Sequence, residues 1–416
     1  ARQVGKSSAV RQLGKTFKYF MEVNFERDKE IISVFTGNLK PKEITSRLAA
    51  FYGIPVVPGE TLLFLDEIQA CTPAIHSLWF FYEDYPELHV VAAGSLLEFA
   101  LKKMAFFGVG RVRSLFMYPM SFDEFLAATG HAGWIEAKRN ASPAEPLFEA
   151  LHGKLVESFR NYLMVGGMPE SVQNWVETED YLKCQQVQDD IMLAYEDDFS
   201  KYEEKADPML LRQTLRSVAQ QIGGKFVYSN VQGNYRSEKI KSALELLKDA
   251  GLVRPAVHTA ANGIPLGAEI NEKFVKYIFL DSGLLLRLLG LENTGGTSEM
   301  SRLVLVGAAS DLVNKGHITE MVTELLKYNT PVQRHDLYYW QNLSRGAQAE
   351  VDYVIVKDMR VVPLEVKAGT TGSMKSMYQF MEEKHLTYGI RTSLENFGKL
   401  EKADIIPLYA LSNLYK

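Results

Sequence analysis

The chain has 416 residues, of which 46% are hydrophobic and 23% charged, and its formal net charge at pH 7 is −5. This length suits two or three domains of roughly 150 residues each, and the composition excludes a collagen-like, wholly disordered or disulfide-rich protein. The negative charge argues against a nucleic-acid binder that is basic over its whole surface, but it allows a local basic face.

The two cysteines, Cys71 and Cys184, lie far apart and have neither metal-ligand spacing nor the pattern of a disulfide framework. Such sparse use of cysteine fits the reducing cytoplasm, and we expect a cytoplasmic protein. No apolar run approaches the roughly 18 residues that a membrane-spanning helix needs, so we expect no membrane partner.

The first residues match the end of a phosphate-binding loop, G-x-x-x-x-G-K-[ST]. The first glycine of that loop would fall one residue before Ala1, so we expect an N-terminally truncated fragment that lacks the preceding strand. The loop would lead into a helix over 7–16, whose positive end faces phosphate. Lys6 would reach the β- and γ-phosphates and Ser7 would bind Mg²⁺. The expected phosphate-binding residues are Val4, Gly5, Lys6, Ser7 and Ser8.

An apolar run over 61–67 ends in two carboxylates, Asp66 and Glu67. A continuous apolar run is typical of a parallel strand that is buried on both faces. Asp66 would help to hold Mg²⁺, and Glu67 would act as the general base for an attacking water. The alternative is a strand followed by an acidic turn, but the upstream GKS sequence favours a nucleotide site.

Residues 88–95 predict a second buried strand, which ends at Ser95. Ser95 would sense the γ-phosphate or cap the helix that follows, and the two roles are compatible. Arg111 or Arg113 would be an arginine finger or a structural residue. A finger acting in trans would imply a homo-oligomer, whereas one acting in cis would not.

Residues 131–200 have mostly helical periodicity, interrupted by a packing turn at Gly166-Gly167. A charged linker over 201–207 ends this part. Helices over 209–222 and 237–250 follow, with a short helix between them, and two strands flank the turn at Asn262-Gly263. This order predicts a winged helix-turn-helix.

Three basic residues, Arg236, Lys239 and Lys241, lie at or near the start of the predicted recognition helix. Such residues contact DNA phosphates or base edges in helix-turn-helix proteins. The alternative is a solvated helix face in a module that binds only protein.

Two strands over 350–356 and 361–367, joined by a short turn, bring Asp352 near Glu365 and Lys367. Glu365 and Lys367 share a face because side chains repeat every two residues. Two converging carboxylates suit Mg²⁺ or Mn²⁺, and Lys367 would steady negative charge on a phosphate. Glu320 would supply a further carboxylate. The alternative is a charged hairpin with a cross-strand Asp–Lys pair.

The order of GKS, LLFLDEIQ, AAGS, GR-V-R, PMSFDEF and GGMPE resembles prokaryotic AAA-type ATPases with an added C-terminal domain of unknown function. From about residue 300 onward the chain resembles the PD-(D/E)xK nuclease core, a superfamily that includes members that bind without cutting. The predicted fold class is α/β: a P-loop NTPase parallel sheet with a helical lid over 1–205, a winged helix-turn-helix over 206–295, and a C-terminal α/β restriction-nuclease-like domain over 296–416.

The most concrete predicted function is ATP binding and Mg²⁺-dependent hydrolysis of ATP, with ATP binding repositioning the other two domains. ATP and Mg²⁺ are the expected cofactors, and DNA is a candidate partner. Two alternatives stay open. One is an ATP-gated, metal-dependent DNA nuclease that uses Asp352, Glu365 and Lys367. The other is a non-cutting regulator that binds DNA or protein and uses the ATPase as a switch.

Overall fold

The computed structural model describes residues 1–37, 40–94, 110–202, 206–290, 336–367, 369–370 and 372–415. The chain divides into two compact units, Ala1–Met117 and Tyr118–Lys416. Among the described residues, no helix is both long and apolar enough to cross a membrane. Both cysteines are free and buried.

Unit 1 contains a three-stranded parallel sheet in the order β1-β2-β3. Its strands are β1 (Tyr19–Asn24), β2 (Thr61–Asp66) and β3 (His89–Ala92), and its helices are α1 (Lys6–Gly14), α2 (Pro41–Tyr52) and α3 (Thr72–Asp84), with 3-10 turns η1 (Lys29–Phe35) and η2 (Ile68–Ala70). The helix predicted over 7–16 and the buried strand predicted over 61–67 are confirmed as α1 and β2. A strand is also present within 88–95 as β3, but it is not buried as predicted, because it lies at the edge of the sheet. β1 was not among the predicted strands.

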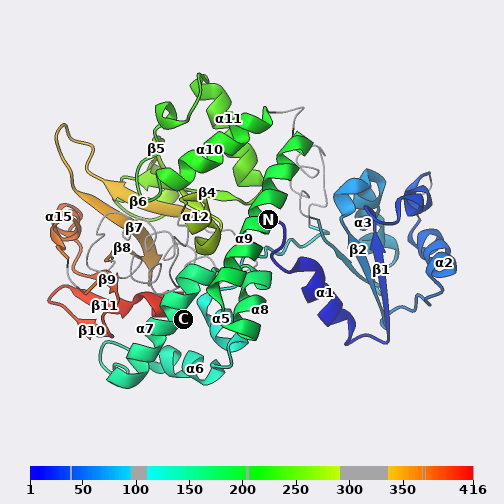
Figure 1. The fold of residues 1–416 in the computed structure, drawn as a ribbon, viewed down its shortest axis with the longest axis horizontal. Coiled ribbons are helices and arrows are strands. Elements are labelled where there is room, and N and C mark those ends of the chain that lie inside the picture. Colours follow the sequence, from blue (N-terminus) through cyan, green and yellow to red (C-terminus); the bar gives the residue numbers. More distant parts are fainter. Residues whose placement is uncertain are drawn as a thin grey trace. The chain divides into compact units, whose positions relative to one another are not determined.

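Helices cover both faces of the unit 1 sheet (Figure 1). Met21 of β1 and Leu63 of β2 are fully buried on the face covered by α2 and α3. On the opposite face α1 comes so close that a Cβ at Gly14 would lie 2.4 Å from the Phe20 ring. This contact fixes the end of α1 against the beginning of β1, while the start of α1 reaches the carboxyl end of β2 through Ser7 and Asp66.

Unit 2 is built around an eight-stranded sheet in the order β10-β11-β9-β8-β7-β6-β4-β5. The strands are β4 (Val253–Thr259), β5 (Ile270–Phe279), β6 (Leu337–Gln341), β7 (Glu350–Lys357), β8 (Arg360–Val366), β9 (Gly389–Ser393), β10 (Gly398–Lys399) and β11 (Ala403–Pro407). The helices are α5 (Phe122–Ala128), α6 (Ala132–Asn140), α7 (Glu149–Val165), α8 (Pro169–Thr178), α9 (Tyr181–Asp198), α10 (Pro208–Gln220), α11 (Ser237–Asp249), α12 (Ser282–Leu288) and α15 (Lys375–Glu383). Short 3-10 segments are η3 (Phe199–Tyr202), η4 (Tyr228–Asn230), η5 (Leu266–Glu269) and η6 (Leu408–Tyr415).

The predicted order of helix, short helix, helix and hairpin is present as α10, η4, α11 and β4–β5. The hairpin is not a separate wing, however, because β4 pairs in parallel with β6 as well as antiparallel with β5. One sheet therefore crosses the boundary predicted at residue 295. In Figure 1, α10 and α11 lie beside β4 and β5, and α15 lies against β7 and β8.

The helices predicted as an ATPase lid are present, but they belong to the compact unit of the C-terminal sheet. Phe122, Phe159 and Tyr162 share one buried core with Leu364 and Tyr409. These helices were predicted to belong to the N-terminal domain, which was expected to end at residue 205. Amphipathic periodicity shows that a helix buries one face, but it does not show which element covers that face.

Polar groups reinforce this packing. Lys138 of α6 is fully buried and pairs with Asp123 at 2.6 Å, while its Nζ also donates to the Ser412 hydroxyl at 2.7 Å. The ring Nδ1 of His152 lies 2.9 Å from the hydroxyl of Tyr409. These bonds join α5, α6 and α7 to the last residues of the chain.

The turn at Gly166-Gly167 is a tight junction, as predicted. Gly166 has φ of 72°, and a Cβ at Gly167 would lie 2.2 Å from the carbonyl oxygen of Met120. The Gly167 N–H donates to Asp281 Oδ2 at 2.6 Å, and the Leu284 N–H donates to Oδ1 at 3.0 Å. Burial raises the pKa of Asp281 to about 6, although these backbone donors oppose the shift.

Candidate functional site

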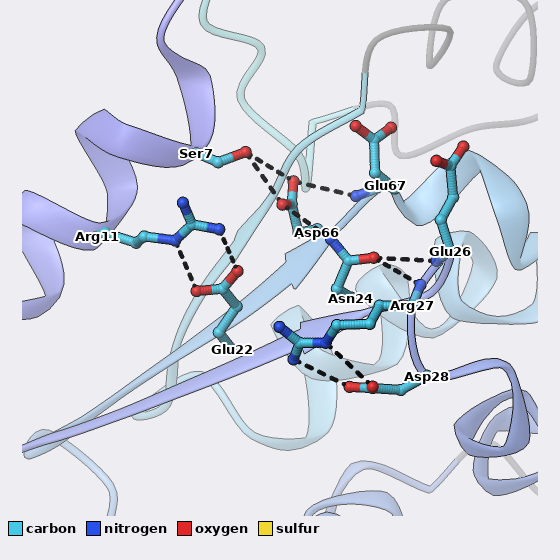
Figure 2. A network of polar contacts seen from close by, with 9 residues as sticks. All are labelled: Ser7, Arg11, Glu22, Asn24, Glu26, Arg27, Asp28, Asp66 and Glu67. Carbon is cyan, nitrogen blue, oxygen red and sulfur yellow. Dashed lines mark hydrogen bonds and ion pairs between the residues drawn. The ribbon is translucent and has the colours of Figure 1, made fainter.

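The candidate site of unit 1 lies where β1 and β2 end beside the start of α1 (Figure 2). Asn24 and Asp66 are register partners at the carboxyl ends of the two parallel strands. Ser7 lies in the first turn of α1 and reaches the same carboxylate. Residues that are 59 positions apart in the sequence are thus hydrogen-bonded, as the nucleotide-site hypothesis expects.

Asp66 is the centre of this network. The Ser7 hydroxyl lies 3.1 Å from Oδ1 and 3.0 Å from Oδ2, the Glu67 N–H donates to Oδ1 at 3.1 Å, and the Asn24 amide donates to Oδ2 at 3.3 Å. Burial raises the pKa of Asp66, and the Ser7 bond opposes that shift because it stabilises the ionised carboxylate.

Asn24 is a site residue that the sequence analysis missed. Its Oδ1 accepts from the backbone N–H groups of Glu26 and Arg27, at 3.1 and 3.0 Å. Because the oxygen is engaged by the turn, the NH₂ group faces Asp66. An asparagine at the end of a strand often forms a turn by accepting a hydrogen bond from the N–H two residues later. This pattern could have identified Asn24 from the sequence, but only once β1 had been recognised.

Two further pairs hold α1 and the loop before it to β1 and the turn after it. Glu22 accepts two hydrogen bonds from Arg11 of α1, at 2.9 and 2.7 Å. Glu26 lies 3.8 Å from the guanidinium of Arg2. Glu22 and Asn24 are two residues apart on the strand, so their side chains share the face that α1 covers.

Lys6 lies in the electrostatic field of both carboxylates. Burial lowers the pKa of Lys6, and the charges of Glu67 and Asp66 oppose the shift. Its ammonium donates to the carbonyl oxygen of Ala1. Gly5 has φ of 87°, which a glycine adopts without strain at the start of the helix. Of the other predicted loop residues, Val4 is buried and Ser8 is exposed.

Glu67 follows Asp66 in a left-handed backbone conformation, with φ of 50° and ψ of 40°. A non-glycine residue in this region carries strain, and such residues gather at functional sites. The Glu67 carboxylate accepts a hydrogen bond from the amide of Gln69 at 2.6 Å. The predicted base is therefore already oriented by a neighbouring residue.

Ser7 and Asp66 fit a magnesium ion. A hydroxyl and a carboxylate are the oxygen donors that this ion prefers, and adjacent ligands of an octahedral Mg²⁺ lie about 3 Å apart. The observed separations of 3.0 and 3.1 Å between the Ser7 and Asp66 oxygens match that spacing.

The predicted arginine finger packs against its own unit. The Arg111 guanidinium pairs with Glu83 at 2.6 Å and lies 4.2 Å from the centre of the Trp79 ring, both on α3. Arg113 is exposed. A catalytic role for Arg111 stays a prediction, and Ser95 lies outside the described residues.

In unit 2, the hairpin β7–β8 brings together three of the four predicted nuclease-like residues. Asp352 and Glu365 are each 3% exposed. The Val366 N–H donates to Asp352 Oδ2 at 2.8 Å, and Lys367 pairs with Glu365 Oε1 at 2.5 Å. Glu320 lies outside the described residues.

Arg391 is a residue of this cluster that the sequence analysis missed. It is the register partner of Glu365 on the neighbouring strand β9 and is almost fully buried. Its guanidinium donates to the carbonyl oxygen of Thr370 at 2.9 Å. A Cβ at Gly372 would lie 2.6 Å from the Lys367 side chain, so the loop after β8 packs closely on that lysine.

Two oxygen-bearing residues on adjacent strands are suitable ligand types for a hard cation, but Lys367 already neutralises one of them. In the part of the chain that the structure describes, no cluster of three or more metal-ligating side chains is found. Because Lys367 pairs with Glu365, this cluster fits a metal less well than Ser7 and Asp66 do.

The three basic residues at the start of α11, Arg236, Lys239 and Lys241, are all exposed. Exposed Glu238 and Glu245 lie on the same helix. The face is therefore accessible but of mixed charge.

A family model described as an AAA domain matches residues 1–126. The N-terminal part is similar to AAA domains. This match supports an AAA-type ATPase family and agrees with the resemblance carried by GKS and LLFLDEIQ. Two models described as domains of unknown function, DUF8612 and DUF4143, match residues 156–295 and 315–411. A search of curated proteins found no match, and neither did a search of solved structures.

The AAA match implies nucleotide-dependent activity for residues 1–126. The two domains of unknown function assign no activity to the rest of the chain. The winged-helix and nuclease-like interpretations therefore stay predictions.

Proposed function

We propose that the chain binds ATP and hydrolyses it to ADP and phosphate with Mg²⁺ at the carboxyl edge of the unit 1 sheet. The observation that carries the proposal is the contact between Ser7 and Asp66 at 3.0–3.1 Å. It joins the end of a phosphate-binding loop to the end of a buried strand. The AAA domain match over the same residues supports it.

Each residue of the site has a defined task in this proposal. Lys6 binds the β- and γ-phosphates, and Ser7 and Asp66 would hold Mg²⁺, which offsets phosphate charge when bound. Glu67 accepts a proton from the attacking water as the new bond to the γ-phosphorus forms. The bond from that phosphorus to the ADP oxygen breaks, and ADP leaves with the electron pair.

Phosphate release from ATP by the full chain tests this proposal. We expect turnover by the parent protein and a loss of at least about a hundredfold in Glu67→Gln, with ATP binding retained. Lys6→Ala should lose ATP binding as well. Equal rates for parent and both variants would refute the proposal.

A second candidate function rests on the buried cluster of Asp352, Glu365 and Lys367. We propose it as a metal-dependent site for cleaving DNA, gated by the ATPase. Glu365→Ala discriminates the possibilities: loss of DNA cleavage favours a nuclease. A parent protein that does not cleave DNA with Mg²⁺ or Mn²⁺ favours a regulator that uses ATP as a switch.

DNA contact by α11 is part of either version of that second candidate. Neutralising Arg236, Lys239 and Lys241 together should weaken DNA binding and reduce its salt dependence, because each phosphate contact releases counterions. Unchanged affinity would leave α11 as a surface for protein.

A further inference from the structure

Gln69 lies on η2, the short turn that follows the two carboxylates of β2. The turn is anchored on both sides. Ile68 is fully buried in the unit 1 core, and its N–H donates to the Ala93 carbonyl oxygen at 3.0 Å. The Ala70 N–H donates to the Glu67 carbonyl oxygen at 3.0 Å. Gln69 is therefore presented from a fixed backbone rather than from a loose loop.

The hydrogen bond between Gln69 and Glu67 has a defined direction. Nε2 of Gln69 lies 2.6 Å from Oε2 of Glu67, and an ionised carboxylate only accepts hydrogen bonds. The amide nitrogen must therefore face the glutamate. A bond of this length to an ionised group belongs to the strong, charge-assisted class.

The oxygen of the same Gln69 amide has no comparable hydrogen bond among the described residues. Among the described residues, Oε1 of Gln69 is buried and has no hydrogen-bond partner. Leaving a polar atom in this state is unfavourable. The orientation of the amide is therefore set by its bond to Glu67 and not by the needs of its own oxygen.

Glu67 needs such a partner because its backbone is in the left-handed region, with φ of 50°. The conformation turns the residue out of the strand direction that Asp66 still follows. A general base must hold its carboxylate within hydrogen-bond reach of one water. Without a second contact the side chain would sample several rotamers, and most of them would point away from that water.

We propose that Gln69 is a positioning residue that fixes the Glu67 carboxylate for proton transfer. The inference rests on the proposed ATPase function and adds a residue to it. Among the described residues, the Gln69 side chain bonds to Glu67 and not to Ser7 or Asp66, so its proposed effect passes through Glu67. This dependence gives a test that a purely structural role would fail.

The test is a double-mutant cycle in the full chain, read as kcat and KM for ATP. Gln69→Met keeps an unbranched side chain of similar length but removes the donor. We expect kcat to fall about tenfold and KM to stay within about twofold. In a Glu67→Gln background, the same substitution should change kcat by less than about twofold, because the carboxylate that accepts the proton is already gone.

Gln173→Met is the matched control. Gln173 also donates to a glutamate, Glu177, at 2.8 Å, but it does so on the exposed surface of α8 in unit 2. This control should leave both kinetic constants unchanged. If Gln69→Met loses ATP binding, Gln69→Asn replaces it, since the shortened amide cannot reach Glu67 but disturbs the turn less.

An unchanged kcat in Gln69→Met, or an equal loss in both backgrounds, would overturn the inference. If Glu67→Gln is inactive while Gln69→Met is fully active, the positioning role fails and the proposed function survives. If Glu67→Gln turns over ATP at the parental rate, the proposed function fails and the inference falls with it.

Discussion

The two units of the chain use their buried charges differently. In unit 1, Asp66 and Glu67 are held by hydroxyl and amide donors from Ser7, Asn24 and Gln69. In unit 2, two carboxylates pair directly with a lysine, Asp123 with Lys138 and Glu365 with Lys367, whereas buried Asp281 accepts from backbone N–H groups. Neutral donors orient a carboxylate and leave its charge available for a cation or a proton, whereas an ion pair consumes that charge.

We interpret the carboxylates of unit 1 as a ligand site and the buried polar contacts of unit 2 as structural cross-links. The charges of unit 1 lie at the carboxyl ends of parallel strands, where ligands bind in open α/β sheets. In unit 2, the bonds from Lys138 to Ser412 and from Gly167 to Asp281 join segments that lie far apart in the sequence. We therefore expect substitutions in unit 1 to affect activity more than stability, and substitutions in unit 2 to do the reverse.

The largest effect on stability should come from Lys138→Met. It leaves Asp123 without its buried partner and should lower the free energy of unfolding by about 3 kcal/mol. Hydrogen exchange should show lost protection in α5, α6 and η6 but not in β1–β3. Arg139→Met is the control, because Arg139 binds the same carboxylate at 3.1 Å from the solvent side and should cost less than about 1 kcal/mol. Equal costs for the two variants would contradict the cross-link interpretation.

The raised pKa of Asp281 should make the free energy of unfolding depend on pH. Its folded-state pKa is raised to about 6, above the ordinary value of 3.8. The folded state therefore binds the proton more tightly, so the contribution is full below pH 3.8 and is lost as pH rises through about 6. The loss should be about 3 kcal/mol or less. Urea denaturation between pH 4 and 8 should show this slope in the parent and a flatter one in Asp281→Asn; an identical slope in both would rule the prediction out.

Lys367→Met tests whether Asp352 and Glu365 of unit 2 form a cross-link or a metal site. Loss of the ammonium leaves Glu365 buried beside Asp352 and should cost about 2 kcal/mol of stability at pH 7. If the two carboxylates bind a divalent cation, millimolar Mg²⁺ should restore part of that loss, because a ligand stabilises the state that binds it. Lys248→Met, which removes an exposed pair with Glu245, should cost less than about 1 kcal/mol. No recovery with Mg²⁺ or Mn²⁺ would argue against a metal site.

The smallest effect should come from Arg11→Ala in unit 1. Hydrogen bonds from Arg11 lower the pKa of Glu22. The pair therefore stabilises the fold fully above the ordinary glutamate pKa, and this contribution is lost as pH falls through the lowered pKa of Glu22. Since Arg11 is 51% exposed, the cost at pH 7 should be about 0.5 kcal/mol. Thermal unfolding at pH 7 and pH 3 measures it, and a cost above about 2 kcal/mol would show that this pair is a cross-link of the unit 2 kind.

The sequence predicted those parts of the fold that local pattern determines. The GKS sequence, the apolar run of β2 and its two carboxylates indicated the unit 1 site before any contact was known. β1 escaped because YFMEVN is short and mixes apolar with polar residues, and Asn24 was missed with it. Gln69 lies within the LLFLDEIQ sequence, but its hydrogen bond to Glu67 could not be predicted because the left-handed backbone conformation of Glu67 is not evident from the sequence.

Long-range pairing was harder to predict. Alternation identified β7 and β8 and placed Asp352 beside Glu365, because a short turn fixes their register. Nothing local indicates that β4 pairs with β6, a partner about 80 residues away, so the hairpin was interpreted as a free wing. The same applies to α5–α9, whose apolar faces meet the C-terminal strands.

The most direct test of the account is the affinity for ATP with and without Mg²⁺, measured by calorimetry on the parent and on Asp66→Asn. If Ser7 and Asp66 share an ion with the phosphates, Mg²⁺ should tighten ATP binding by the parent at least about tenfold, because the coupling between two ligands is reciprocal. Asp66→Asn should lose that dependence and keep its stability. An ATP affinity that ignores Mg²⁺ in the parent, or the same Mg²⁺ dependence in both proteins, would contradict the account.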